Sequence, residues 1–264
     1  MSSSPDRRPL NAPPGLPVRR LDVVETTGST NADLLARHAA GDDIRGAVLV
    51  AEHQTAGRGR HGRSWSAPPR SQIALSIGVD AADVPPANWG WLPLLTGVAL
   101  VDAIREATGV EALLKWPNDV LVGDGKLAGI LAEVAAPEPV IVVGLGVNVT
   151  LTAGEAPDPR ATSLSMLGSP NTDRDFLLKC ILGELISRIE QWRSAGGRDS
   201  ELMSDYRHRS ATLGAQVRAI LPGGREVTGT ACAIDDLGRL SIDTGTETAR
   251  VSAGDVVHLR PATD

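Results

Sequence analysis

The chain has 264 residues, enough for one large domain or two modest ones, so its core needs neither disulfides nor a structural metal. Its 42% apolar and 22% charged residues are ordinary for a folded protein and argue against disorder over most of the length. The formal net charge of -6 gives no overall electrostatic reason to bind nucleic acid or an acidic membrane, so any such contact must be local.

The only cysteines are Cys180 and Cys232, which have no CxxC or Cys/His ligand spacing. This usage fits a reducing compartment and excludes a zinc ribbon or a disulfide framework, and we interpret both as packing residues. No apolar run reaches the roughly 18 residues of a membrane span. The first 21 residues contain prolines where a signal peptide would place its apolar segment. We therefore expect a cytoplasmic protein with no membrane partner.

The elements begin after a segment of unusual composition. Residues 1–18 contain five prolines and three serines and cannot bury enough apolar area to offset ordering, so we expect a flexible tail. A short strand over 21–25 follows. Gly28-Ser29-Thr30-Asn31 then opens a helix that ends at Gly41, with Ser29 or Thr30 as its N-cap. Largely apolar segments predict strands over 46–53 and 72–79, and the stretch between them has no apolar periodicity.

The rest of the chain divides at about residue 210. Up to that point we expect a helix over 89–108, a strand over 112–116, a hairpin of strands 119–122 and 126–134, a buried strand over 139–150, and helices over 175–192 and 200–209. From Ala211 onward, short strands separated by turn residues indicate a small β-barrel of about fifty residues. The expected organisation is a tail over 1–18, a larger domain over 19–210 and a small domain over 211–264.

A glycine-rich motif, Gly57-Arg58-Gly59-Arg60-His61-Gly62, follows the second strand with the spacing G-x-G-x-x-G. A dinucleotide-binding fingerprint needs these glycines to open a helix, but here they lead into RSWSAPP, which cannot be one. Arginines among glycines suit a mobile cationic flap that orders over an anion, because guanidinium pairs bidentately with phosphate or carboxylate. A solvated basic turn is the alternative.

Two of the three lysines lie in a second constellation, made of Lys115-Trp116-Pro117-Asn118-Asp119 and Lys126-Leu127-Ala128-Gly129. Two ammonium groups on paired strands could flank one phosphoryl group, while Asp119 could hold a metal ion or accept a proton. A hairpin with ordinary surface lysines is the alternative.

Five motifs together resemble the biotin protein ligase family in order and spacing, strongly over residues 22–150 and by layout over the remainder. They are Ser29-Thr30-Asn31, EHQTAGRGRHGRSW over 52–65, Lys115 to Asp119, Lys126 to Leu131, and Gly144-Leu145-Gly146-Val147-Asn148. The resemblance implies an α+β fold: a class II synthetase-like catalytic domain with a mixed sheet and flanking helices, plus a small C-terminal SH3-like β-barrel.

The chain resembles the monofunctional form of that family. Bifunctional members carry an N-terminal DNA-binding domain, whereas only about twenty proline-rich residues precede the first motif here. The segment 211–264 has five arginines against seven acidic residues and so offers no basic face. We therefore expect no DNA partner.

The resemblance implies a two-step reaction with biotin and ATP as substrates and Mg2+ as the metal. Biotin carboxylate attacks the α-phosphorus of MgATP, releasing pyrophosphate and leaving biotinyl-5'-AMP. The ε-amine of a lysine on a biotin carboxyl carrier domain of an acyl-CoA or pyruvate carboxylase, such as acetyl-CoA carboxylase, then attacks the mixed anhydride and expels AMP. No enzyme nucleophile is required, so the protein supplies positioning, charge stabilisation and exclusion of water.

The resemblance also assigns residues. The biotin-binding set is Ser29, Thr30, Asn31, Gln54, Arg58, Gly59, Arg60 and Lys126, and the nucleotide-binding set is Arg58, His61, Trp65, Lys115, Asn118 and Asn148. Catalysis is expected from Lys126 first and Lys115 second, with Arg60 closing over the anions and Asp119 holding Mg2+ or taking the proton of the incoming lysine. The plain alternatives are a helix cap for Ser29 and Thr30, a loop anchor for Trp65 and a turn residue for Asn148.

Three other functions are alternatives to this one. A lipoate-protein ligase shares the catalytic fold, but its expected signature, combining Arg-Arg, Gly-Gly-Gly and His-Asp, is absent. A biotin-sensing transcription regulator would need a DNA-reading helix and a basic patch. A nicotinamide-dependent oxidoreductase rests on the glycine pattern alone.

Overall fold

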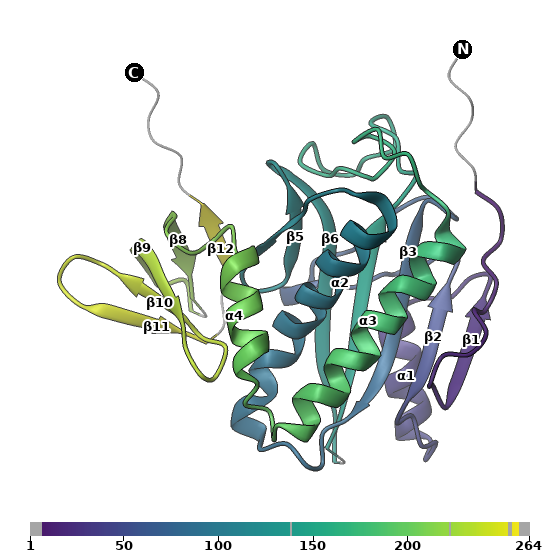
Figure 1. The fold of residues 1–264 in the computed structure, drawn as a ribbon, viewed down its shortest axis with the longest axis horizontal. Coiled ribbons are helices and arrows are strands. Elements are labelled where there is room, and N and C mark those ends of the chain that lie inside the picture. Colours follow the sequence, from purple (N-terminus) through teal and green to yellow (C-terminus); the bar gives the residue numbers. More distant parts are fainter. Residues whose placement is uncertain (1–6, 138, 222, 253–254, 259–264) are drawn as a thin grey trace.

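The computed structural model describes residues 7–137, 139–221, 223–252 and 255–258. Its framework is a seven-stranded sheet beside a five-stranded sheet (Figure 1). The larger sheet has the order β1 (Arg20–Val24), β2 (Ala47–Ala51), β3 (Gln72–Asp80), β7 (Val140–Asn148), β6 (Gly125–Ala135), β5 (Asp119–Val122) and β4 (Leu113–Lys115). β1 and β2 are parallel and the other pairs antiparallel, so the predicted mixed sheet and α+β class are confirmed.

Helices cover both faces of this sheet, which is why β3 and β7 at its centre are almost wholly buried (Figure 1). Side chains alternate between the faces of a strand. On one face, Leu49 and Val142 pack with Leu34 of α1 (Thr30–Ala39). The alternate residues of these strands point to the other face, where they pack against α2 (Leu92–Thr108) and α3 (Arg174–Ser194) in the main core.

The central helix explains the most apolar stretch of the chain. Pro86–Thr108, a short 3-10 turn (Pro86–Trp91) followed by α2, has a mean hydropathy of 1.2 and is long and apolar enough to cross a membrane by length and composition. The expectation that no run reaches that length is therefore wrong. However, 78% of its most apolar 18-residue window is buried inside the protein, as expected for the core helix of a globular domain. The helix ends at Gly109, whose φ of 71° is the left-handed cap that glycine adopts readily.

The C-terminal sheet is antiparallel, in the order β11 (Thr248–Val251), β10 (Leu240–Asp243), β9 (Glu226–Ile234), β8 (Gln216–Ile220) and β12 (Asp255–His258). It follows α4 (Ser200–Arg209). Two indole N–H groups attach it to the larger sheet: Trp91 donates to the Asp236 carbonyl at 2.9 Å and Trp116 donates to the Gly238 carbonyl at 3.0 Å. These bonds hold the turn between β9 and β10 beside the start of α2 and the end of β4.

The two cysteines are free thiols. Cys180 is half-buried on α3, whereas Cys232 is exposed on β9. The interpretation of Cys232 as a packing residue is therefore wrong.

The structure also corrects the predicted flexible tail over residues 7–11. Leu10 belongs to the main core, and its N–H donates to the Glu52 carboxylate. Asn11 donates from its backbone and side chain to Asp175, at 2.8 and 2.9 Å. Bonds to charged partners offset the cost of ordering, and composition does not reveal them. Residues 1–6 lie outside the described residues.

Candidate active site

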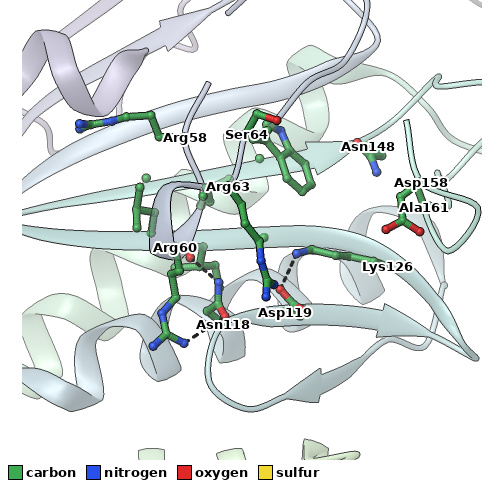
Figure 2. Close-up of a pocket in the computed structure, with 18 of the residues that line it drawn as sticks. Arg58, Arg60, Arg63, Ser64, Asn118, Asp119, Lys126, Asn148, Asp158 and Ala161 are labelled. Atoms are coloured by element: carbon green, nitrogen blue, oxygen red, sulfur yellow. Dashed lines mark hydrogen bonds and ion pairs between the residues drawn. The ribbon is translucent and has the colours of Figure 1, made fainter. Parts of the chain in front are cut away.

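A pocket of about 580 Å³ opens where the larger sheet meets the glycine-rich segment and β12 (Figure 2). Nearly every residue that the sequence analysis selected lines it: Ser29, Thr30, Asn31, Gln54, Arg58, Gly59, Arg60, Trp65, Lys115, Asn118, Asp119, Lys126 and Asn148. The exception is His61, which is exposed and absent from the lining. Residues far apart in the sequence thus share one cavity.

One end of the pocket is a chain of buried polar groups at the start of α1. Ser29 is the N-cap, as predicted, and accepts the Ala32 N–H at 3.5 Å. Thr30 donates from its N–H and its hydroxyl to the Gln54 side-chain oxygen, at 2.9 and 3.2 Å. Ser76 lies between Thr30 and Asn31, with its Oγ at 2.7 Å from Thr30 Oγ1 and 2.6 Å from Asn31 Oδ1. These groups offer donors and acceptors to a small polar ligand.

Asn31 is fixed from two further directions. Its Nδ2 donates to Glu133 Oε2 at 2.8 Å and to the Leu131 carbonyl at 3.2 Å. The same Glu133 oxygen pairs with Arg58 at 2.8 Å. Gly144 makes room, because a Cβ there would lie 2.1 Å from Asn31 Oδ1. Glu133 therefore links the arginine of the glycine-rich segment to the polar end of the pocket.

The glycine-rich segment over residues 57–65, called the flap below, is a small hairpin. Gly59 N–H donates to the Arg63 carbonyl at 2.7 Å, and Trp65 N–H donates to the Gly57 carbonyl at 2.8 Å. Its tip is a 3-10 turn over Arg60–Gly62, with no helix after it, so the geometry of a dinucleotide-binding fingerprint is absent from the flap. Figure 2 shows Arg63 pointing from the flap toward Asp119, and Arg60 beside Asn118, where Nη1 lies 3.5 Å from Oδ1.

Trp65 lies over the floor of the pocket. Its indole N–H donates to Gln72 Oε1 at 2.6 Å. Two paired glycines let the ring approach the sheet, because a Cβ at Gly146 would lie 2.4 Å from the indole nitrogen and one at Gly129 would lie 3.2 Å from the ring. The Lys126 ammonium is 5.5 Å from the ring centroid, within the range of a cation–π contact.

The lysines and Asp119 meet at the middle of the pocket. Lys126 Nζ forms an ion pair with Asp119 Oδ1 at 2.6 Å (Figure 2). Asp119 pairs in the sheet with Lys115, which ends β4. The Lys126 backbone also bonds the loop over residues 150–161, since its N–H donates to the Arg160 carbonyl at 2.6 Å. With the flap arginines nearby, this arrangement favours a ligand that carries several negative charges.

The two asparagines expected to contact a nucleotide also hold the backbone together. Asn118 Nδ2 donates to the Ile130 carbonyl at 2.9 Å, and Asn148 Nδ2 donates to the Thr162 carbonyl at 2.9 Å. Each side-chain amide is thus partly used in fixing the pocket wall.

The C-terminal sheet supplies a wall that sequence reasoning missed, made of Val256, Val257 and His258. The Thr212 hydroxyl oxygen accepts the Trp116 N–H at 3.0 Å and lies 3.0 Å from His258 Nε2. Burial, together with the positive charge of Lys115, lowers the pKa of His258. No local signal in the sequence predicts that this strand reaches the lysines.

Other missed residues are Ser76, Glu133, Asp158 and Arg160. For Ser76 the sequence did hold a signal: Ala74, Ser76 and Gly78 are small residues at alternate positions, so one face of this strand leaves room for a ligand or a neighbour. Glu133 had none, since its partners Asn31 and Arg58 lie far away in the sequence, and nothing local shows that the pair Asp158 and Arg160 reaches the pocket.

Comparison with known proteins shows which family has this architecture. Residues 23–149 match the Biotin/lipoate A/B protein ligase family, and residues 212–259 match the Biotin protein ligase C terminal domain. The fold and the pocket therefore define a protein ligase of the biotin/lipoate class.

Individual relatives narrow the class. The chain is 58% identical over 245 residues to the biotin–[acetyl-CoA-carboxylase] ligase of Mycobacterium tuberculosis, covering 92% of this chain and 90% of that protein. It is 31% identical over 241 residues to the bifunctional ligase/repressor BirA of Bacillus subtilis, covering 89% and 72%. The structure of the Aquifex aeolicus biotin protein ligase in complex with biotin and ATP superposes with a TM-score of 0.79 at 26% identity, covering 92% and 100%. The chain belongs to the biotin protein ligase family.

Proposed function

We infer that the protein is an ATP-dependent biotin protein ligase, which forms biotinyl-5'-AMP from biotin and ATP and then transfers biotin to a lysine of a biotin carboxyl carrier domain. One observation carries this inference: a single cavity joins a buried polar cluster at the start of α1 to a cationic centre around Lys126. A ring that donates and accepts hydrogen bonds fits the first, and a carboxylate meeting a triphosphate fits the second. The names of the relatives favour biotin over lipoate.

We propose that Ser29, Thr30, Asn31 and Gln54 hold the ureido ring of biotin. Support comes from their burial and from the hydrogen-bond chain that fixes their orientation before a ligand arrives. Such preorganisation reduces the ordering cost of binding. The flap residues Arg58, Gly59 and Arg60 would close the same end of the pocket, since Arg58 is already tied through Glu133 to Asn31.

Adenylation would take place around Lys126. Its ammonium is paired with Asp119, and an entering carboxylate and α-phosphate would exchange for that partner. Lys126 and Lys115 would then stabilise the charge that develops on the phosphoryl group, with Arg60 closing over it. Asp119, released from Lys126, becomes available to accept the proton of the incoming lysine.

We propose that Arg58, His61, Trp65, Lys115, Asn118 and Asn148 contact the nucleotide. For most of them the support is their place in the pocket lining. His61 lies on the exposed side of the flap, so its contact requires a movement of the flap tip over the bound nucleotide.

Mg2+ would enter as MgATP, with Asp119 as the proposed ligand. The support is a carboxylate in the pocket lining, but Lys126 already pairs with Oδ1 of that carboxylate. Within the residues that the structure describes, no group of three or more His, Cys, Asp or Glu side chains could hold a metal ion. A role for Asp119 toward the metal therefore depends on Lys126 moving to the substrate anions.

Further proposals follow for organisation and partners. The domain over 19–210 would carry the chemistry, and the domain over 211–264 would add the β12 wall. The acceptors would be carrier domains of acetyl-CoA, other acyl-CoA and pyruvate carboxylases. Absence of a DNA partner is supported by the net charge of -6, and a cytoplasmic location by the free cysteines.

The experiment that tests this function is substrate-dependent pyrophosphate release from ATP by the purified protein. We expect release with biotin and background release with lipoate. Release driven by lipoate instead would assign the lipoate ligase activity to this pocket. Tight biotin binding with no pyrophosphate release, combined with a gel shift of operator DNA, would assign a sensor.

A further inference from the structure

The N-terminal segment over residues 7–11, called the strap below, contacts two sides of the pocket from outside. It begins beside the N-terminal end of α3 and continues along the edge of the sheet toward β1 (Figure 1). The catalytic assignments above do not use it, and composition predicted that it would be free. Besides its bonds to the start of α3, the strap contacts two glutamates, Glu52 and Glu155, that lie two to three residues before the pocket-lining residues Gln54 and Asp158.

The first contact completes a buried ion pair. Arg174 Nη1 lies 2.6 Å from Glu52 Oε2, and the two side chains are 3% and 2% exposed. The strap supplies the remaining partners, because Leu10 N–H donates to Glu52 Oε1 and Arg174 Nη2 donates to the Arg8 carbonyl. A buried charge is costly unless its hydrogen bonds are made, so this pair and the strap hold one another in place.

That ion pair lies directly behind the biotin end of the pocket. Glu52 precedes Gln54, which fixes Thr30, by two residues. Arg174 Nη1 also donates to the Gln72 carbonyl at 3.3 Å, and the Gln72 side chain accepts the Trp65 indole N–H. The ion pair is thus connected to Trp65 through Gln72 and to Gln54 through two residues of chain.

The second contact holds the loop over 150–161. Arg7 Nη2 lies 2.6 Å from Glu155 Oε2 and 3.2 Å from the Thr150 carbonyl. The hydrogen bond from Arg7, together with those from Thr152, lowers the pKa of Glu155 to about 2. Residues later in the same loop, Asp158 and Arg160, line the pocket near Lys126.

We propose that the strap positions the two ends of the active-site pocket: Leu10 and its neighbours set the biotin end through Glu52, and Arg7 sets the nucleotide end through Glu155. The proposal rests on the proposed ligase function. Strap residues touch neither substrate, so they are positioning residues. Their loss should weaken one substrate at a time, which loss of global stability alone would not do.

The test compares point variants of the full chain by steady-state pyrophosphate release. Arg7→Ala should raise the ATP KM about fivefold, the usual effect of losing a charge-assisted contact, with the biotin KM and kcat within about twofold of the unchanged chain. Leu10→Gly should raise the biotin KM, and the biotin Kd in calorimetry, about tenfold while changing the ATP KM less. Arg7→Lys, which keeps the charge, should restore most of the ATP KM.

The matched control is Arg193→Ala, which removes a similarly exposed arginine from its ion pairs with Asp80 and Asp83. This control should leave both KM values unchanged. The proposal is overturned if folded Arg7→Ala has an unchanged ATP KM, or if Arg7→Ala and Arg193→Ala shift the kinetics alike. Should Leu10→Gly fail to fold, Arg7→Ala alone decides. An unchanged chain without biotin-dependent release would instead overturn the proposed function.

Discussion

Replacement of Gly144 by alanine tests the polar end of the pocket most sharply. The new methyl group would lie 2.1 Å from Asn31 Oδ1 and 2.9 Å from Asn31 Cγ, separations that require the asparagine to move. Gly144 itself lies on β7, at the centre of the larger sheet, where the backbone has little freedom to adjust. The side chain of Asn31 must therefore give way.

The cost follows from the bonds that Asn31 makes. Its displacement disturbs contacts with Glu133 at 2.8 Å, Ser76 at 2.6 Å and the Leu131 carbonyl at 3.2 Å. A neutral hydrogen bond contributes about 1 kcal/mol net and a charge-assisted one about twice that. If the displaced Asn31 loses one charge-assisted bond of this network and is no longer positioned for biotin, the free energy of biotin binding weakens by about 2 kcal/mol, or roughly thirtyfold in Kd.

The assay is calorimetric titration with biotin, supported by the thermal unfolding midpoint. The control is Gly183→Ala, on the exposed side of α3 with open space around it, which should leave the Kd unchanged and stabilise the helix by about 0.5 to 1 kcal/mol. A Gly144→Ala protein that is folded and binds biotin with the affinity of the unchanged chain would refute the placement of biotin against Asn31.

Four further predictions follow from the site. Lys126→Ala should lower adenylate synthesis about a hundredfold, worth ~3 kcal/mol of charge stabilisation, whereas replacement of Lys179, an exposed residue of α3, by alanine should not; near-normal pyrophosphate release by the Lys126 variant would contradict the assignment. Biotin and ATP together should protect the flap over 57–65 from trypsin, and equal cleavage with and without them would count against closure of the flap. Arg60→Gly should still form adenylate but release it, so that bystander proteins become biotinylated; bystander labelling at the level of the unchanged chain would reassign Arg60. Because the pKa of folded His258 lies below its usual 6.5, the unfolded chain binds more protons than the folded one between the two pKa values, so stability should fall as the pH drops below 6.5; His258→Gln should flatten this slope in thermal unfolding, and an identical slope would exclude the histidine as its source.

Local signals in the sequence predicted the elements well where periodicity and caps agree. The helix over 200–209 has the expected bounds, and Ser29 caps the helix it was expected to cap. The strand expected over 72–79 is observed as Gln72–Asp80. These features depend on neighbouring residues, which the sequence displays directly.

Contacts between distant segments explain what the sequence could not predict. Glu133 could not be recognised as a site residue from the sequence, because only the position of β6 in the folded sheet brings it to Asn31 and Arg58. The wall at His258 depends on how the two sheets dock. Docking of Leu10 depends on a buried carboxylate that pairs with an arginine on α3. In each case the partner lies far along the chain and only tertiary folding selects it.

The most direct test of the proposed function is transfer of labelled biotin to a biotin carboxyl carrier domain, with and without ATP. We expect label on the carrier lysine only when ATP is present, and none on a carrier whose acceptor lysine is replaced by arginine. Label that requires no ATP, or no label under any condition from folded protein that binds biotin, would contradict a ligase mechanism through an adenylate.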